Sequence, residues 1–372
     1  MLHLTIDLRK AFDAGIGTYI RNVVPRVLDR LGPELRVVAL VPHDQVDRYG
    51  WFPAQRAEMR SMRAMPFSVG EQFEFRRMLG RDTPFWATSL AHPLWHRGPL
   101  VATVHDVAQL ALSRSEGMSV PVSLAVRLLL ANLRRRAAAL MAVSDFTRQE
   151  FVHRVGEPAC GRIAVTPLGV DASWFDAASA HADPRAAPSF VCVGSVRPHK
   201  NIARLLQACA QVADRLPHTL VIAGLVPQAG ELEPMLAKMP AALRQRIRFT
   251  GLVPDAELRR LVAAADALVF PSLYEGFGLP ALEAMAAGCP VLASTAGALP
   301  EVCGAAAAGS FDPRSVEQIA RTLIEQASLT AVQRQVIVER GIAHAQAFTW
   351  ERTAEFTAEA IRTVLRRQGA PG

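Results

Sequence analysis

The segment YEGFGLPALEAMAAG combines two carboxylates with a glycine-bearing turn, and it follows a short apolar run that ends at Phe270. Glu275 lies in the expected loop, and Glu283 lies in the first turns of a helix predicted to start at Pro280. A carboxylate at Glu283 can accept two hydrogen bonds from a ribose diol. The spacing therefore predicts ligand-facing roles for both glutamates.

The backbone of this turn offers a second kind of contact. Amides at a helix N-terminus bind anions, because they lack partners within the helix and lie at the positive end of its dipole. We expect such amides to face a departing phosphate or sugar hydroxyls. They belong to Gly276, Phe277, Gly278 and Leu279.

The segment VGSVRPHKN places Arg197, His199 and Lys200 directly before a predicted helix. Cations at a helix N-terminus oppose the helix dipole, so their presence there favours a compensating anion, and a bound diphosphate would supply it. Lys200 is one of three lysines in an arginine-rich chain. A solvated lysine is the alternative interpretation.

Two loops in the first half have a similar placement. GIGTY follows the first predicted strand, and its Gly15 and Gly17 would let backbone amides approach a phosphate. The full G-x-G-x-x-G spacing is missing, so a plain turn into a helix explains the glycines equally well. In VATVHDVA, His105 ends an apolar strand, where it can hydrogen-bond a ligand or shuttle a proton, while Asp106 can simply cap the next turn.

Strand and helix patterns alternate along the whole chain, which predicts an α/β protein with parallel sheets between helices. Ligands of such sheets bind at the carboxyl ends of the strands, where all four loops are expected. The predicted strands are 2–6, 36–41, 100–104, 140–143, 163–166, 190–193, 219–223, 248–250, 267–270 and 290–293. The predicted helices are 18–31, 121–138, 145–155, 202–216, 280–287, 315–327, 331–347 and 350–367.

The chain of 372 residues suits two domains. The small and polar stretch 177–188 is typical of a linker, which predicts domains over 1–180 and 181–348 and a terminal helix in 349–372.

No apolar run is long enough to span a membrane, and the start of the chain lacks an apolar secretory core, so we expect a cytoplasmic protein. The five cysteines show no C-x-x-C pairing, which favours reduced, buried thiols.

The formal net charge is +7, and the first 180 residues carry 22 basic and 17 acidic side chains. Arginines gather between residues 56 and 81 and between 127 and 136, on a helical apolar pattern, as on a surface for anionic lipid. A solvated arginine-rich face is the alternative. We expect no nucleic-acid partner, since 6% of the residues are aromatic and no helix-turn-helix or zinc motif is present.

Taken together, these motifs resemble the retaining, nucleotide-sugar-dependent glycosyltransferases of family 4. The resemblance covers nearly the whole chain, through the two glutamates, STAGALPEV, VGSVRPHKN, GIGTY, VHD, VSDFTRQE and PLGVD. It implies the GT-B fold, in which two Rossmann-like domains face a central cleft. The first domain would bind the acceptor, the second would bind the nucleotide-sugar, and the C-terminal helix would cross back to the first.

The resemblance also implies roles for individual residues. Glu275 would contact the donor sugar near the reacting carbon, Lys200 the diphosphate, and His105 the donor sugar from the first domain. Many relatives place a partner arginine at the positions of Ser195 or His199, so Arg197 is the arginine left for that role. The implied donor-binding positions are Gly15, Ile16, Gly17, Gly194, Ser195, Gly251, Gly276, Phe277, Gly278, Leu279 and Glu283.

The implied activity is transfer of a hexose with retention, without a metal or other cofactor. LPEV and PHKN look most like the branch that uses GDP-mannose in surface polysaccharide assembly, which predicts a mannosyltransferase acting on a glycan or lipid-linked oligosaccharide, peripheral on the inner membrane. A UDP-sugar donor stays open. A nucleotide-sugar epimerase and a non-catalytic sugar-nucleotide-binding protein stay open as well.

Overall fold

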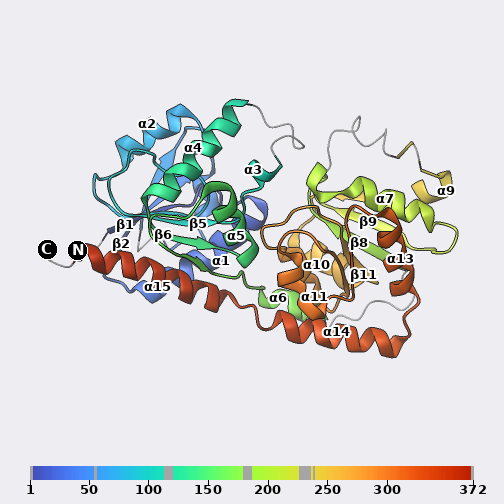
Figure 1. Cartoon of the computed structure of the whole chain (residues 1–372). Helices are drawn as coiled ribbons and strands as arrows, with labels where there is room; N and C mark the ends of the chain where they lie inside the picture. Colours follow the sequence, from blue (N-terminus) through green and yellow to red (C-terminus); the bar gives the residue numbers. More distant parts are fainter. Residues whose placement is uncertain are drawn as a thin grey trace. The chain divides into compact units, whose positions relative to one another are not determined.

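The structure is a computed structural model that describes residues 3–53, 57–112, 120–178, 187–225, 236–237 and 239–369. The chain divides into two compact units (Figure 1). The first unit comprises Met1–Gly169 together with Trp350–Gly372, and the second comprises Val170–Thr349. Both are α/β, as the alternating patterns predict.

The first unit contains a seven-stranded parallel sheet in its described part, in the order β3-β2-β1-β4-β5-β6-β7. Side chains of α2, α4 and α5 form a core on one face of the sheet. On the other face, Tyr19 of α1 hydrogen-bonds Thr103 of β5 over 2.9 Å. The strands are β1 His3–Asp7, β2 Arg36–Pro42, β3 Ala57–Met62, β4 Phe85–Ala87, β5 Leu100–Val104, β6 Ala137–Ala142 and β7 Ile163–Val165. The helices are α1 Ala14–Leu31, η1 His43–Tyr49, α2 Val69–Met78, α3 Ala108–Ala111, α4 Val120–Arg136, α5 Asp145–Val155 and α15 Trp350–Gly369.

The second unit contains a six-stranded parallel sheet in its described part, in the order β10-β9-β8-β11-β12-β13. Apolar side chains of α7 and α13 pack on one face of it. The strands are β8 Ser189–Val193, β9 Thr219–Ala223, β10 Ile247–Gly251, β11 Ala267–Phe270, β12 Val291–Ser294 and β13 Gly309–Phe311. The helices are α6 Ala172–Ala178, η3 Pro198–Lys200, α7 Ile202–Gln211, α9 Ala241–Arg244, α10 Asp255–Ala263, α11 Leu279–Ala286, α12 Leu299–Cys303, η4 Gly304–Ala306, α13 Val316–Ala327 and α14 Ala331–Ala345.

Strand order reverses once in each sheet. In the first unit β1 lies between β2 and β4, and in the second unit β8 lies between β9 and β11. The chain therefore leaves the two central strands of each sheet in opposite directions, and ligands of open α/β sheets bind beyond the carboxyl ends of such strands. The GIGTY turn follows β1, VGSVRPHKN follows β8, and the loop with Glu275 follows β11.

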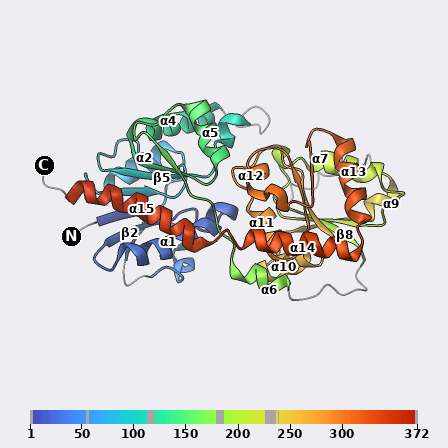
Figure 2. The ribbon, with the colours of Figure 1, turned by 60° about the horizontal axis from the view of Figure 1, so that its bottom comes forward.

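The final helix, α15, belongs to the first unit and lies beside α1 (Figure 2). Arg26 of α1 forms an ion pair with Glu351 over 2.8 Å, and Arg362 donates to the carbonyl of Arg30 over 3.0 Å. Thr353 donates to the carbonyl of Pro167. The terminal helix thus returns to the first unit, as the resemblance implies.

The two units divide after Gly169, earlier than the boundary expected near residue 180. The physical reason is that α6 packs on α10 and α11 of the second unit, so the chain joins that unit before the linker-like stretch. Residues 179–186 of that stretch lie outside the described residues.

Most predicted elements form close to their expected bounds, but some predictions were wrong. Helix α1 starts at Ala14 rather than residue 18, so the glycine turn is its first turn. Strand β6 starts at Ala137, inside the predicted helix 121–138, because its residues pair with β5 in the sheet. Helix α7 ends at Gln211, short of residue 216. The pattern gave no sign of β3, β4, β13 or α2.

Candidate functional site

The loop after β8 depends on glycine at two positions. Gly194 has φ +138°, and a Cβ there would lie 3.4 Å from Cε of Lys200. Gly224, at the end of β9, has φ +148°, and a Cβ there would lie 2.2 Å from the carbonyl oxygen of Gly194. A side chain at either site would strain the backbone, and one at position 224 would also collide with the backbone of Gly194. The two glycines therefore let the loop pack against β9 beside Lys200.

Lys200 and Glu275 meet beyond the carboxyl ends of β8 and β11. The Nζ of Lys200 donates to Oε1 of Glu275 over 2.7 Å, and both side chains are mostly buried, with exposed fractions of 18% and 14%. The ammonium also lies 5.4 Å from the centre of the Phe270 ring. Two residues predicted from separate motifs are thus brought together at the reversal point of the second sheet.

Asn201 fixes the position of Lys200. It adopts the left-handed conformation, with φ +59°, between η3 and α7. Its side-chain amide donates to the carbonyls of Pro271 and Pro313, over 3.0 and 2.7 Å, and the amide of Leu273 donates to the carbonyl of His199 over 2.7 Å. The loop with Lys200 is therefore tied to the loop with Glu275 by both backbone and side chain.

The STAGALPEV segment supports Glu275 from the other side. Gly297 has φ +65°, and a Cβ there would lie 2.6 Å from the backbone nitrogen of Glu275. The amide of Ala298 donates to the carbonyl of Glu275 over 3.0 Å. The backbone around Glu275 thus depends on glycine at position 297.

In the turn before α11 the apolar side chains are buried, so contacts with a ligand would come from its backbone amides. Phe277 and Leu279 are buried, and the Phe277 ring lies 6.2 Å from that of Phe348. Gly278 has φ +106°, and a Cβ there would lie 2.5 Å from the Leu299 side chain. Within the described residues, the amides of Phe277, Gly278 and Leu279 donate no hydrogen bond. Their contact with a ligand stays a prediction.

Glu283 lies on α11, one turn beyond its first residue. Burial raises the pKa of its carboxyl to about 8, and the charges of Asp255 and Asp171 act in the same direction. Arg259 and a hydrogen bond from the Trp174 side chain oppose this shift. In the absence of a ligand, the group is therefore mostly protonated at pH 7.

Helix α1 of the first unit has an open N-terminus. Asp13 precedes it without capping it through its side chain, and within the described residues the amides of Ala14, Gly15 and Ile16 donate no hydrogen bond. A Cβ on Gly17 would lie 2.6 Å from the carbonyl oxygen of Ala11, whereas one on Gly15 would meet nothing within 4 Å. Gly17 is therefore required by close packing, and Gly15 leaves room in front of the amides.

His105 follows β5 and is held in one orientation. Its Nε2 donates to the carbonyl of Thr88 over 2.9 Å, and its ring packs edge-on against Tyr19. Burial, with a smaller contribution from the charge of Lys10, lowers the pKa of His105 to about 4 against the opposing effect of the hydrogen bond to Thr88. The ring is thus neutral at pH 7, with Nδ1 as an acceptor, which favours hydrogen bonding over proton transfer. Asp106 accepts from the amide of Ala108 over 2.9 Å, so it caps the next turn.

Three further predicted site residues have few contacts that bear on ligand binding. Arg197 is exposed, and within the described residues it forms no ion pair. Ser195 is partly exposed in the loop after Gly194. Gly251 ends β10 with φ +68°, and its carbonyl accepts from the amide of Gly224 over 3.1 Å. The contacts of these residues with a ligand stay predictions.

The sequence reasoning missed the residues that support the site. Asn201 is part of the quoted PHKN motif, and an asparagine before a helix is a recognised sign of left-handed backbone. Gly224 closes a predicted strand, and Gly297 is part of STAGALPEV, so both carried a signal. No sequence signal marked Trp174, since its contact with Glu283 depends on how α6 packs against α11.

Comparison with known proteins covers both units. Residues 14–174 match the family described as Glycosyltransferase Family 4, and residues 187–328 match the family described as Glycosyl transferases group 1. A crystal structure of Anabaena Alr3699/HepE in complex with UDP and glucose superposes with a TM-score of 0.76 at 18% identity, over 98% of this chain and 100% of that one. This likeness shows the fold.

Two curated relatives add sequence similarity. The O-antigen chain mannosyltransferase B of Escherichia coli is 33% identical in an alignment of 236 residues that covers 61% of this chain and 61% of that protein. The matched part is therefore less than two thirds of that relative. The D-inositol 3-phosphate glycosyltransferase of Segniliparus rotundus is 29% identical over 397 residues, covering 95% of this chain and 85% of that protein. With Glycosyltransferase Family 4 matched in the first unit, Glycosyl transferases group 1 matched in the second, and both parallel sheets in place, the chain belongs to the glycosyltransferases of the GT-B fold.

Proposed function

We propose that the protein is a retaining glycosyltransferase that moves mannose from GDP-mannose to a glycan or lipid-linked saccharide. The observation that carries the proposal is the 2.7 Å pair of Lys200 and Glu275 at the reversal point of the second sheet. At that place a cation can bind the diphosphate of a nucleotide-sugar, and a carboxylate can bind its sugar hydroxyls.

The main task of the site is to stabilise the departing diphosphate. When the bond between the anomeric carbon and the phosphate oxygen breaks, negative charge grows on that oxygen. The Lys200 ammonium has three donors, so it can bond a phosphate oxygen while it keeps its contact with Glu275. The open amides before α11 add further donors that are already oriented, and such fixed donors lower the barrier most effectively.

The remaining predicted residues have supporting roles in this proposal. Glu275 accepts from hydroxyls of the donor sugar, and Glu283 accepts from the ribose. In the first unit, the open amides of α1 address the phosphates, and neutral His105 accepts from the sugar through Nδ1. These donors can supply the positive charge that the leaving group needs, so we propose that the reaction uses no metal.

Support for mannose comes from the E. coli relative, whose name is that of a mannosyltransferase. The relative from Segniliparus is named for a phosphorylated inositol, so a phosphorylated small-molecule acceptor is the second candidate. A UDP-sugar donor of the same fold is the alternative on the donor side.

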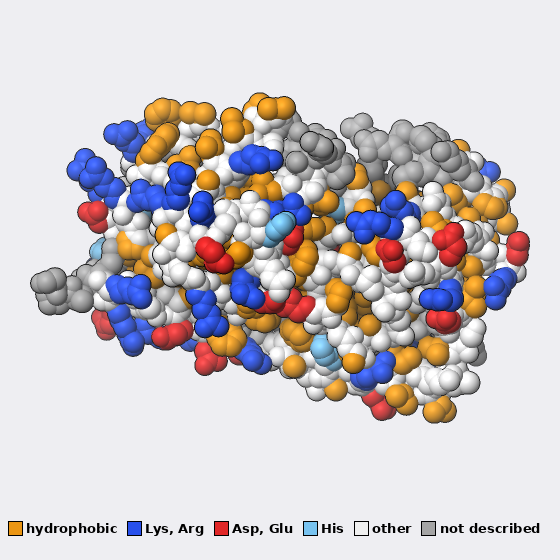
Figure 3. Space-filling view, viewed as in Figure 1, with side chains coloured by type: hydrophobic (Ala, Val, Ile, Leu, Met, Phe, Trp, Pro, Cys, Tyr) orange, Lys and Arg blue, Asp and Glu red, His pale blue; other side chains and the backbone are white. Residues whose placement is uncertain are grey.

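We also propose that α4 attaches the protein to the inner surface of the cytoplasmic membrane. Val120, Leu124 and Leu128 are exposed along one stripe of this helix, and the exposed Arg127 and Arg135 lie close to that stripe in the helical register. In Figure 3, hydrophobic and basic side chains lie near one another over α2 and α4. Within the described residues, no helix is long and apolar enough to cross a bilayer. Arg56, part of the predicted basic region, lies outside those residues.

Attachment can be tested by sedimentation with vesicles. The protein should sediment with phosphatidylcholine vesicles that contain phosphatidylglycerol and stay in solution with phosphatidylcholine alone, because opposite charge adds to apolar insertion. Leu124→Ser with Leu128→Ser should abolish this binding, whereas Val332→Ser, at an exposed position of the second unit, should not. Equal sedimentation with both vesicles would contradict the proposed surface.

The donor is tested by thermal shift with GDP, UDP, ADP and their common sugar conjugates. A ligand at 100 times its Kd stabilises a protein by about 2.7 kcal/mol, which is readily seen. We expect stabilisation by GDP and GDP-mannose, unchanged by a metal chelator, and little by the others. A response to UDP compounds alone would replace the proposed donor, and no response at all would contradict the nucleotide-sugar site.

A further inference from the structure

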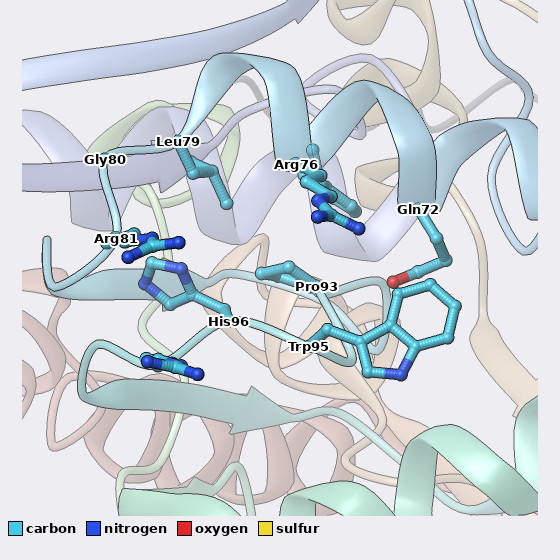
Figure 4. A pocket seen from close by; sticks show the side chains of 10 residues that line it. Gln72, Arg76, Leu79, Gly80, Arg81, Pro93, Trp95 and His96 are labelled. Carbon is cyan, nitrogen blue, oxygen red and sulfur yellow. The ribbon is translucent and has the colours of Figure 1, made fainter.

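The first unit contains a pocket between α2 and the segment that leads into β5. Its volume is about 430 Å³, which lies within the usual range for small-molecule sites. Gln72 and Arg76 project from α2 toward Pro93 and Trp95, and Arg81 lies beside His96 (Figure 4). The proposed donor site uses none of these residues.

The pocket is strongly basic. Arg76, Arg81 and Arg97 line it, all are exposed, and none forms an ion pair with a carboxylate of the described chain. The field of Arg136 reaches the same place, since together with burial it lowers the pKa of His96. Guanidinium groups that converge without a counter-ion favour an anionic ligand, and they suit phosphate through their planar fork of donors.

The acidic residues nearby are engaged elsewhere, with one exception. Glu71 of α2 forms an ion pair with buried Arg9, and Glu74 accepts from the amides of Arg63 and Ala64. Asp82 is the carboxylate that acts on His96, and it also has other partners. Three arginines facing one carboxylate leave a net positive charge in the pocket.

One wall of the pocket is aromatic. The Trp95 side chain is 67% exposed, although indole is among the side chains most stabilised by burial. Pro93 and Leu79 continue this apolar surface. A flat ring next to guanidinium groups complements a ligand with an apolar face and an anionic end. A pyranose ring with a phosphate has both.

The walls are held in place before any ligand arrives. Both ends of the Gln72 side-chain amide bond the facing segment: its nitrogen donates to the carbonyl of His92 over 3.1 Å, and its oxygen accepts from the amide of Leu94 over 2.8 Å. Nε2 of His96 donates to the carbonyl of Thr83 over 2.6 Å, and a Cβ on Gly98 would lie 2.4 Å from that same oxygen. Such a preformed site avoids part of the entropy that binding costs.

The pocket lies at the amino ends of the strands, whereas His105 lies at their carboxyl ends. Arg81 precedes β4, Arg97 precedes β5 and Arg136 precedes β6, so these residues lie at the amino ends of parallel strands. His105 follows the carboxyl end of β5, and the five residues of that strand span about 16 Å. The pocket is therefore separate from the predicted donor-binding residues of this unit.

We propose that this pocket binds a phosphorylated sugar, with the phosphate between the arginines and the pyranose ring against the indole of Trp95. The sugar phosphate can be a free metabolite or the headgroup of a lipid-linked saccharide. The two sources share this chemistry and differ in whether an apolar chain continues from the phosphate. The inference does not depend on the proposed transfer reaction.

The test is calorimetric titration of the full chain with glucose 1-phosphate, inorganic phosphate and glucose. Glucose 1-phosphate should bind more tightly than either fragment, because it engages both walls. Trp95→Ala and the double variant Arg76→Ala/Arg97→Ala should each weaken binding at least about tenfold, as expected for loss of a stacked ring or of charge-assisted hydrogen bonds. Intrinsic fluorescence should change on binding in the parent and not in Trp95→Phe.

Two control variants make the outcome specific. Arg162→Ala removes an exposed arginine of the same unit that has no ion pair in the described chain, and Lys200→Ala removes the proposed diphosphate contact. Both should bind glucose 1-phosphate as the parent does. If Lys200→Ala loses binding while the Trp95 and arginine variants keep it, the sugar phosphate occupies the donor site and the pocket proposal is wrong.

The source is distinguished by phosphatidylcholine vesicles that contain a prenyl-diphosphate-linked glucose. Capture of the parent and not of Trp95→Ala assigns the lipid headgroup, and binding of glucose 1-phosphate without capture assigns the free sugar phosphate. Either result supports the pocket. Equal affinity for inorganic phosphate and glucose 1-phosphate, unchanged by Trp95→Ala, or no binding of any probe, would overturn it.

Discussion

At the scale of single residues, the pairing of Lys200 with Glu275 has an energetic consequence. Both side chains are largely buried, so removing either one leaves the other as a desolvated charge without its partner. Their positions could be predicted from sequence, since each lies in a specific motif after a clear strand. Their 2.7 Å contact could not, because it depends on Asn201, which ties two distant loops together, and on the close packing of Gly297 against the backbone of Glu275.

For Lys200→Ala we expect kcat to fall by about a hundredfold to a thousandfold, the range seen when one preorganised charge-stabilising donor is removed. Lys200→Arg should keep a larger share of the activity, because it keeps the charge. Steady-state kinetics with circular dichroism as a check of folding measure this. Unchanged kcat in a folded Lys200→Ala protein would exclude Lys200 from stabilising the leaving group.

Glu283 predicts a pH dependence of donor binding. Its pKa is raised to about 8 in the free protein, so about a tenth of the molecules carry the carboxylate at pH 7. A ribose diol donates hydrogen bonds and therefore favours the ionised form, so donor binding should release a proton. Affinity should rise with pH up to about 8 and then level off.

The measurement is donor affinity by calorimetry between pH 6 and 9. Glu283→Gln has the same shape without a titrating proton, so its affinity should be lower and free of this pH dependence. A parent whose affinity does not change with pH, or changes equally in Glu283→Gln, would show that Glu283 does not hold the ribose.

At the scale of elements, the sequence predicted strands that are buried on both faces and missed short ones. β5 is apolar except for Thr103 and β11 is apolar throughout, and their predicted bounds agree with the structure. β4 and β13 have three residues each, as has the predicted β7, so a pattern of that length reveals a strand only in some cases, and edge strand β3 is polar and partly exposed. Such strands form because their backbones hydrogen-bond to neighbouring strands of the sheet.

Helix α1 allows a matched test of its two glycines. A Cβ at position 17 would meet the Ala11 carbonyl at 2.6 Å, so Gly17→Ala should lower the free energy of unfolding by about 1–3 kcal/mol. Position 15 has open space and helical backbone, so Gly15→Ala should be neutral or stabilise by up to about 1 kcal/mol.

Urea unfolding followed by circular dichroism compares the two glycine variants. Equal stability of both would mean that the first turn of α1 does not pack against Ala11 as the structure shows. A Gly15→Ala protein of full stability with weaker donor binding would further support the role of the open amides.

At the scale of the whole molecule, the resemblance predicted the architecture better than the domain boundary. Two parallel sheets and a returning C-terminal helix follow from the alternating pattern and the family motifs. The boundary was placed from composition, at the small and polar stretch 177–188. The structure divides after Gly169, because α6 carries enough apolar surface to pack on α10 and α11. Composition alone does not reveal which side of a linker a short helix joins.

The most direct test of the proposed activity is transfer itself. The full chain is incubated with GDP-mannose and a panel of mannosyl oligosaccharides, and the products are analysed by mass spectrometry and NMR. We predict a product one mannose longer, with the anomeric configuration of the donor, formed by the parent and scarcely by Lys200→Ala. Transfer from a UDP-sugar only, inversion at the anomeric carbon, or equal activity of Lys200→Ala would contradict the account.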